Sequence, residues 1–347
     1  MPPLVSPYAR LLGLRGDVRI DFIESVALAK NPLGDPCSRP VVAYLPPGYD
    51  DGGSKRYPVI YVLHGYTGSA AGLIGARPWE TNVAQWADRL IVDGTMKSAI
   101  VVMVDGFSRL GGSQFVDSVQ NGAYGTYVTR DVVAHVDASY RTIANEGGRA
   151  VAGKSSGGFG SMHLTMRFPG VFCAFASHSG DSYFRYASPP SFPAASRTLE
   201  AHGYDIRAFV EAFENKHKRD QSEYQTMEML GYAAAYSPGS AAPFDIDLPW
   251  DRESGALDEA VFARWLAYDP VEEAPRRAAE LGRLRLRYLD CGRRDEYGLD
   301  IGAREMARVI KALGLGIRHE EFDDDHRNVG YRYAVSLPAL SEILENE

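Results

Sequence analysis

The sequence predicts an α/β fold with a mostly parallel central sheet, helices on both of its faces and a helical cap insertion. Short, continuous apolar runs, as expected for strands buried on both faces, lie at 57–65, 98–106, 149–155 and 170–180. Segments with apolar residues at helical spacing separate these runs, at 79–92 and 124–140. The alternation resumes near the C-terminus, with strands expected at 284–292 and 316–322 and helices at 300–314 and 331–344.

The N-terminal region predicts an antiparallel entry to this sheet. Two strand-like stretches, 18–29 and 39–45, show mixed alternation and are joined by the turn-rich segment KNPLGDPCS.

The strand–helix rhythm stops after Gly180 and returns at Leu284. Aromatic, charged and turn-forming residues fill the interval, in which 205–218 and 257–266 are expected to be helical. We therefore expect an α/β core formed by 1–180 and 283–347 and a cap or lid formed by 181–282. The alternative is that this insertion is a peripheral decoration with no role in function.

The composition limits the class of partner. The chain has 347 residues, of which 45% are hydrophobic and 24% charged, and a net charge of −8. This balance argues against a general affinity for nucleic acid or an anionic membrane surface. No stretch approaches the roughly 18 uninterrupted apolar residues of a membrane span, and the N-terminus does not resemble a signal peptide.

The cysteines point to the compartment. Cys37, Cys173 and Cys291 are too few and too scattered for a disulfide framework or a zinc site. Free thiols fit a reducing environment, so we expect a cytoplasmic protein. The oligomeric state, including a homo-oligomer, stays open.

The segment VAGKSSGGFG, residues 151–160, reads as a tight corner between a strand and a helix. Gly153 and Gly157 flank Ser155 in the pattern G-x-S-x-G, which holds a serine hydroxyl above the end of a sheet on a strained backbone. Of the two adjacent serines, Ser155 is therefore the expected nucleophile. Ser156 begins the helix, where its backbone N–H would face a developing oxyanion.

A serine nucleophile needs a base and an acid, which in this topology follow in the order Ser, Asp or Glu, His. The loop after the strand at 284–292 offers Asp295; Asp290 closes the strand, and Glu296 is the reserve candidate. The loop after the strand at 316–322 offers His326, whereas His178 follows an earlier strand, where the base is not expected. The expected triad is Ser155, His326 and Asp295.

Two further features complete the expected site. The loop LHGYTGSAAG is small enough for its backbone to approach a ligand, so the amides of Tyr66 and Ser156 are the expected oxyanion hole, with His64 fixing the loop. The run from Asp323 to His326 does not predict a metal site, because consecutive residues rarely converge on one ion. We expect neither a metal nor a cofactor.

The sequence resembles the esterase family of α/β-hydrolases that includes S-formylglutathione hydrolases, feruloyl esterase modules and the mycolyltransferases of the antigen 85 complex. The matching phrases are VVAYLPPGYDDGGSKRYPVIYVLHGYTGS, GTYVTRDVVAHVDASYRT, AGKSSGGFGSMHLTMRFPGVF, LDCGRRDEYG and FDDDHRNVGYRY. The resemblance implies an α/β-hydrolase fold and the same assignments: Ser155, His326 and Asp295, with the Tyr66 and Ser156 amides. The chain departs from its relatives between Gly180 and Leu284, so the substrate of no relative carries over.

These features predict a serine carboxylic ester hydrolase that acts through an acyl-enzyme on a small or aromatic ester. Aromatic residues of the insertion, among them Tyr183, Phe184 and Trp265, are expected to contact this substrate; the alternative is that they pack the cap. An acyltransferase or an S-formylglutathione thioesterase could use the same triad. A non-catalytic binding protein is the remaining alternative, which the intact Ser, Asp and His set disfavours.

Overall fold

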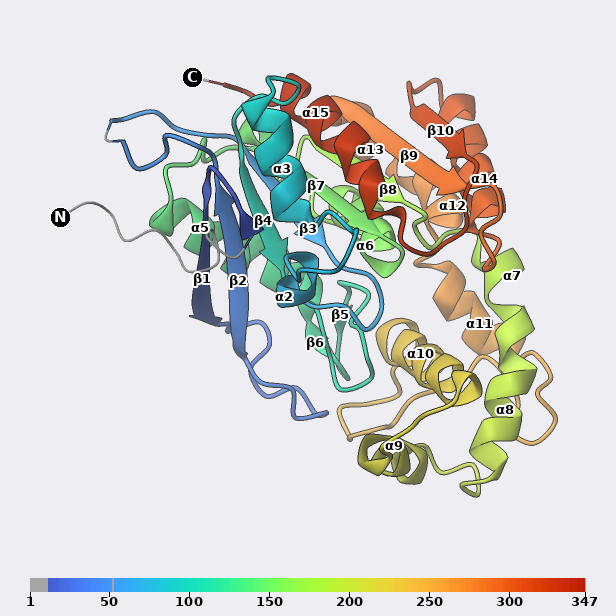
Figure 1. Cartoon of the computed structure of the whole chain (residues 1–347). Coiled ribbons are helices and arrows are strands. Elements are labelled where there is room, and N and C mark those ends of the chain that lie inside the picture. Colours follow the sequence, from blue (N-terminus) through green and yellow to red (C-terminus); the bar gives the residue numbers. More distant parts are fainter. Residues whose placement is uncertain (1–11, 52, 347) are drawn as a thin grey trace.

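A computed structural model describes residues 12–51 and 53–346. Eight strands form one sheet in the order β1-β2-β4-β3-β7-β8-β9-β10 (Figure 1). The strands are β1 (Asp17–Glu24), β2 (Ser38–Leu45), β3 (Val59–Leu63), β4 (Ile100–Val104), β7 (Arg149–Lys154), β8 (Ala174–His178), β9 (Leu286–Gly292) and β10 (Arg318–Phe322). Strand β2 runs antiparallel to both neighbours, and the other pairs are parallel. The predicted α/β fold is confirmed.

Helices cover both faces of the sheet, as the sequence predicts. One face packs against α4 (Tyr124–Thr126), η1 (Tyr127–Val132), α5 (Val133–Ser139), α6 (Ser156–Arg167), α13 (Ala278–Arg283) and α14 (Leu299–Ala312). The other packs against α2 (Ala70–Leu73), α3 (Val83–Val92) and α15 (Tyr333–Ile343). Successive residues of β3 therefore belong to different cores, since side chains of a strand alternate between the two faces.

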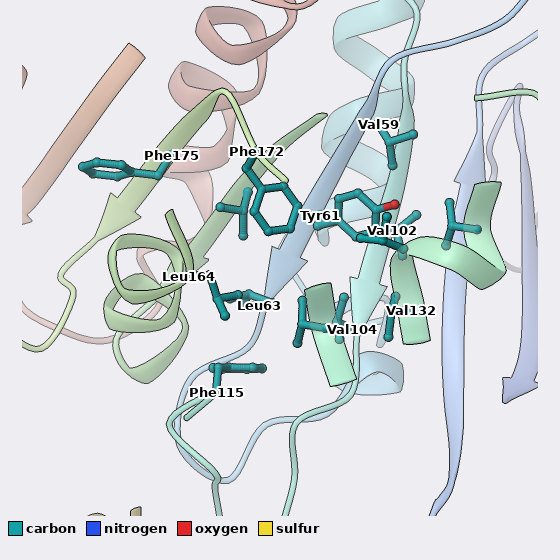
Figure 2. Packing of buried hydrophobic residues seen from close by; sticks show 14 of the residues in the cluster. Val59, Tyr61, Leu63, Val102, Val104, Phe115, Val132, Leu164, Phe172 and Phe175 are labelled. Carbon is teal, nitrogen blue, oxygen red and sulfur yellow. The ribbon is translucent and has the colours of Figure 1, made fainter. Parts of the chain in front are cut away.

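Figure 2 shows the first of these cores. Tyr61 and Leu63 of β3 point to the same side as Val102 and Val104 of β4, and Leu164 of α6 packs beside them. All of these side chains are fully buried. This packing holds α6 at a fixed distance from the sheet. It thereby also holds the corner between β7 and α6 in place.

The segment between β8 and β9 is mostly helical. It comprises α7 (Phe184–Ala187), η3 (Pro189–Ser191), α8 (Phe192–Glu200), α9 (Ile206–Asn215), α10 (Gln221–Tyr236), α11 (Glu259–Leu266), α12 (Pro270–Glu273), η4 (Ala274–Arg277) and α13. Helices α8 to α11 gather beside the sheet in Figure 1 and share a hydrophobic core of their own. In contrast, Val271, Ala274 and Leu281 belong to the core under the sheet, so the separate helical unit ends near 269.

Several element boundaries differ from the expectations. The strand expected at 18–29 ends at Glu24, and the helix expected from 79 begins at Val83, where the Asn82 side chain caps it. The helix expected at 124–140 contains the π-helical turn η1. Helices α8 and α10 and the hairpin of β5 (Asp117–Ser118) and β6 (Gly122–Ala123) have no counterpart in the sequence-based expectations.

No helix within the described residues has the length and apolar character needed to cross a membrane.

Candidate active site

Ser155 lies at the corner between β7 and α6 with a φ of 57° and a ψ of −124°. A non-glycine residue with such a positive φ is strained, and neighbouring contacts must hold it there. Its N–H donates to the carbonyl of His178 at 2.9 Å. A Cβ at Gly153 would lie 2.9 Å from Gly157 Cα, and one at Gly157 would lie 2.7 Å from the carbonyl oxygen of His64. The two glycines are therefore required by close backbone approach.

His326 and Asp295 stand in line with the Ser155 hydroxyl. His326 Nε2 lies 3.0 Å from Ser155 Oγ, and His326 Nδ1 lies 2.8 Å from Asp295 Oδ2. The other Asp295 oxygen accepts from the N–H of Tyr297 at 3.0 Å. Burial opposes ionisation of Asp295, but the hydrogen bond and charge of His326 and the N–H groups of Tyr297 and Leu299 together hold the pKa of Asp295 below its usual value. An ionised Asp295 fixes the proton on His326 Nδ1 and leaves Nε2 free to accept the serine proton.

Glu296, the second candidate for the acid, forms no hydrogen bond with the imidazole ring of His326. One of its oxygens accepts from the backbone N–H of His326 at 3.0 Å, and the other pairs with Arg327 Nε at 3.1 Å. Glu296 therefore holds the loop that carries His326.

Asp290 belongs to a second Ser–His–Asp set. His178 Nδ1 lies 2.7 Å from Asp290 Oδ1, and His178 Nε2 lies 2.8 Å from Ser336 Oγ. Burial raises the pKa of Asp290, but His178 and Arg332 together lower it below its usual value. Ser336 is 0% exposed and His178 1%, so no substrate reaches this set. It ties β8, β9 and α15 together beneath the corner that carries Ser155.

The loop after β3 lies close to Ser155. A Cβ at Gly65 would lie 3.3 Å from Ser155 Cβ. His64 holds this loop: its Nδ1 donates to the Gly65 carbonyl at 2.7 Å, and its Nε2 accepts from the Gly106 N–H at 2.8 Å. Burial lowers the pKa of His64, which keeps the ring neutral and suits this pair of bonds. The Tyr66 hydroxyl donates to the Leu110 carbonyl at 3.0 Å and anchors the other end of the loop.

Ser156 directly follows Ser155, and Tyr66 directly follows Gly65, the residue whose backbone lies close to Ser155. Ser156 is the first residue of α6, where an N–H has no acceptor within the helix. A helix N-terminus also carries a partial positive charge that favours an anion.

A cavity of about 450 Å³ opens above Ser155 and His326. Phe184, Leu299 and Tyr297 form part of its wall. Helix α10 provides the far wall with six residues, namely Gln221, Tyr224, Gln225, Glu228, Met229 and Tyr232. The volume suits a small or medium-sized organic group.

Only one of the three aromatic residues expected to contact substrate lies in this wall. Phe184 lines the cavity, whereas Trp265 and Tyr183 do not. Trp265 is fully buried in the core of the helical unit, and its Nε1 donates to Ser237 Oγ at 2.8 Å. The Tyr183 backbone is held by Asp269, and its side chain packs against the core under the sheet. The positions of Trp265 and Tyr183 agree with the alternative named above, in which the aromatic residues of the insertion pack against other side chains instead of contacting substrate.

The sequence analysis missed the wall that α10 provides. Tyr224, Glu228 and Tyr232 are spaced by four residues and therefore share one face of the helix. This four-residue spacing was the sequence pattern from which one polar and aromatic face of α10 could have been predicted. Asp181, directly after β8, also lines the cavity and had no distinguishing pattern around it.

Within the described ranges 12–51 and 53–346, no three His, Cys, Asp or Glu side chains gather in a way that could hold a metal ion.

The sheet, the strained serine corner and the aligned Ser, His and Asp side chains define the class of protein as an α/β-hydrolase. Comparisons with known proteins agree. Residues 35–335 match a family described as "Putative esterase", and the chain belongs to this family.

Individual relatives are more distant. A segment of 152 residues, 40% of this chain, is 29% identical to an endo-1,4-beta-xylanase/feruloyl esterase from Xylanibacter ruminicola, but it covers only 19% of that protein. Among solved structures, a ferulic acid esterase aligns with a TM-score of 0.59 and 21% identity, over 95% of this chain and 99% of that one. An S-formylglutathione hydrolase from Agrobacterium tumefaciens aligns with a TM-score of 0.59 and 16% identity, over 96% and 97% of the two chains. At these identities the structures establish the fold alone.

Proposed function

We propose that the protein hydrolyses carboxylic esters with Ser155 as nucleophile, His326 as general base and acid, and Asp295 as the residue that orients His326. The observation that carries this proposal is the alignment of Ser155 Oγ, His326 and Asp295 at 3.0 and 2.8 Å on the floor of a cavity. Membership of an esterase family supports it.

The reaction follows from this geometry. Ser155 Oγ attacks the ester carbonyl carbon while His326 Nε2 takes the hydroxyl proton, and the carbonyl electron pair moves onto oxygen. The N–H groups of Tyr66 and Ser156 stabilise this oxyanion. Collapse breaks the bond to the alcohol, which leaves with the proton from His326. A water molecule then attacks the acyl-enzyme by the same route and frees the acid.

The substrate class is a small or aromatic ester. The cavity volume of about 450 Å³ and its tyrosine-rich wall support this choice. The helical unit of α8 to α11 would act as the cap, because α10 closes one side of the cavity. Cys37, Cys173 and Cys291 are unpaired, which fits a location in the reducing cytoplasm.

The test uses p-nitrophenyl esters of increasing acyl length with wild type, Ser155→Ala and Ser336→Ala. Ser336 is the matched control, because it also hydrogen-bonds a histidine that contacts an aspartate but lies away from the cavity. We expect turnover by wild type and by folded Ser336→Ala, and none above background by Ser155→Ala. A fully active Ser155→Ala variant would refute the assignment.

A further inference from the structure

The far wall of the cavity contains two carboxyl groups joined through one hydroxyl. The Tyr232 hydroxyl lies 2.9 Å from Asp181 Oδ2 and 3.3 Å from Glu228 Oε1. Asp181 is only 7% exposed and also accepts from Gln114 Nε2 at 3.0 Å and, over a longer distance of 3.5 Å, from Ser156 Oγ. Asp181 is thus held by donors of the protein, whereas Glu228 has the Tyr232 hydroxyl alone as its hydrogen-bond partner among the described residues.

Neither carboxyl group has a cation beside it. In the part of the chain that the structure describes, no Lys, Arg or His nitrogen lies within ion-pair distance of Asp181 or Glu228. Burial, followed by the charge of Asp181, raises the pKa of Glu228 to about 8. At neutral pH Glu228 therefore keeps its proton, because burial disfavours the charged form and the charge of Asp181 adds repulsion.

The groups that face Glu228 come from four segments. They are Asp181 after β8, Tyr232 on α10, Tyr66 after β3 and Tyr297 after β9. Three of the four are tyrosines, and Tyr224 and Phe184 line the same cavity. Aromatic faces combined with a carboxylate form the environment in which ammonium groups bind, through attraction to the ring electrons and to the charge.

The cations of the cavity lie toward the triad. Lys154 directly precedes the nucleophile and interacts with Asp295, Glu296, Asp181 and Asp325, and burial lowers its pKa. Arg327 is paired with Glu296. Among residues 12–51 and 53–346, Asp181 is the charged group that acts appreciably on Glu228. The cavity is therefore polarised, with its cationic side chains near Ser155 and an unpaired acidic, aromatic end under α10.

We propose that this end of the cavity is a subsite for an ammonium group carried by the ester substrate, with Glu228 as the specificity-determining carboxylate. The inference rests on the proposed ester hydrolysis and specifies its substrate class. A bound ammonium takes the place of the Glu228 proton and leaves the two carboxylates with the same single net negative charge, whereas an uncharged group cannot offset the charge of deprotonated Glu228. A carboxylate group on the substrate would meet Asp181 and Glu228 and be rejected.

The test compares esters that differ only in one charged atom. One pair carries the difference in the acyl group: p-nitrophenyl 4-(trimethylammonio)butanoate and p-nitrophenyl 5,5-dimethylhexanoate. The other carries it in the alcohol: choline butyrate and 3,3-dimethylbutyl butyrate. In at least one pair we expect kcat/KM for the ammonium ester to exceed that of its carbon isostere by about tenfold, which corresponds to about 1.4 kcal/mol.

Glu228→Gln removes the charge but keeps the shape, and Glu259→Gln on the exposed start of α11 is the matched control. We expect the ratio of the two esters to fall toward one in Glu228→Gln and to stay at the wild-type value in Glu259→Gln. The wild-type ratio should also rise between pH 6 and 9, as Glu228 loses its proton. A pH dependence of the chemical step that the two esters share affects both equally and cancels in the ratio.

The outcomes separate the two proposals. If wild type hydrolyses no ester, the proposed function fails. If it hydrolyses the neutral esters without an ammonium preference, or with a preference that Glu228→Gln retains, the subsite is wrong and the esterase stands. If Glu228→Gln does not fold, a pH-independent ratio in wild type overturns the subsite by itself.

Discussion

Replacing Gly157 by alanine tests whether the backbone packing at the serine corner determines activity. A Cβ there would lie 2.7 Å from the His64 carbonyl oxygen and closer still to that of Leu63, whereas an ordinary contact needs at least 3.4 Å. The backbone must therefore move by more than about 0.7 Å, which is the shortfall of the His64 contact alone, because the Leu63 contact is closer. It can do so only by separating the start of α6 from the loop that carries Tyr66.

This displacement acts on two quantities. Misplacing a reacting group by about 1 Å costs on the order of 10²-fold in rate, so we expect kcat to fall by one to two orders of magnitude. Overpacking of a rigid site costs about 1–3 kcal/mol in the free energy of unfolding. The assay is p-nitrophenyl butyrate turnover, with urea denaturation of the same samples.

The matched control is Gly316→Ala. Gly316 lies before β10, has ordinary backbone angles, and its added Cβ would meet no atom within 4 Å. We expect unchanged kcat and a slight gain in stability, because alanine has fewer unfolded conformations. A Gly157→Ala variant with wild-type kcat and stability would show that the corner tolerates a Cβ, and the reasoning on backbone approach would be refuted.

Three further predictions concern carboxylates. Asp295→Asn should lower kcat by about 10⁴-fold, because an amide no longer fixes the proton on His326 Nδ1. The control is Glu296→Gln, which changes the carboxylate beside the His326 backbone N–H. It should lower kcat far less in the same assay. Asp290→Asn should lower the unfolding free energy by about 3–5 kcal/mol, since it breaks a buried charge network, while the folded variant keeps substantial turnover. Glu228 has a folded pKa of about 8 and a usual value of 4.5, so its cost to stability grows as pH rises from 4.5 to 8. Urea denaturation should therefore show Glu228→Gln gaining stability relative to wild type at pH 9 compared with pH 5; an equal difference at both pH values would contradict the burial of Glu228.

The sequence was sufficient to predict the sheet and the approximate position of each triad residue. Strands β3, β4, β7 and β8 are buried on both faces, so their apolar runs are continuous and easy to recognise. Once the strands are placed, chain order assigns Ser155, Asp295 and His326 to loops at the same edge of the sheet. The distances among these side chains depend on packing between distant segments, which no local pattern contains.

The walls of the cavity were less predictable. Ala233 to Tyr236 of α10 are all buried, so the helix lacks the one-sided apolar pattern by which a helix is recognised. Trp265 was assigned to substrate because large aromatic residues often line pockets, yet the same property lets it fill the core of the helical unit. Residue type alone does not distinguish these two roles.

The second Ser–His–Asp set shows which features of the candidate site carry the functional assignment. Ser336, His178 and Asp290 match the hydrogen-bond distances of the first set to within about 0.2 Å. However, Ser336 lies inside the regular helix α15 and is fully buried, while Ser155 has a positive φ and opens into the cavity. A serine hydroxyl can attack only where a substrate carbonyl carbon can reach it and where N–H groups can donate hydrogen bonds to the oxyanion. Backbone strain and access to the cavity therefore distinguish Ser155, the proposed nucleophile, from Ser336, and the chain of hydrogen bonds alone does not.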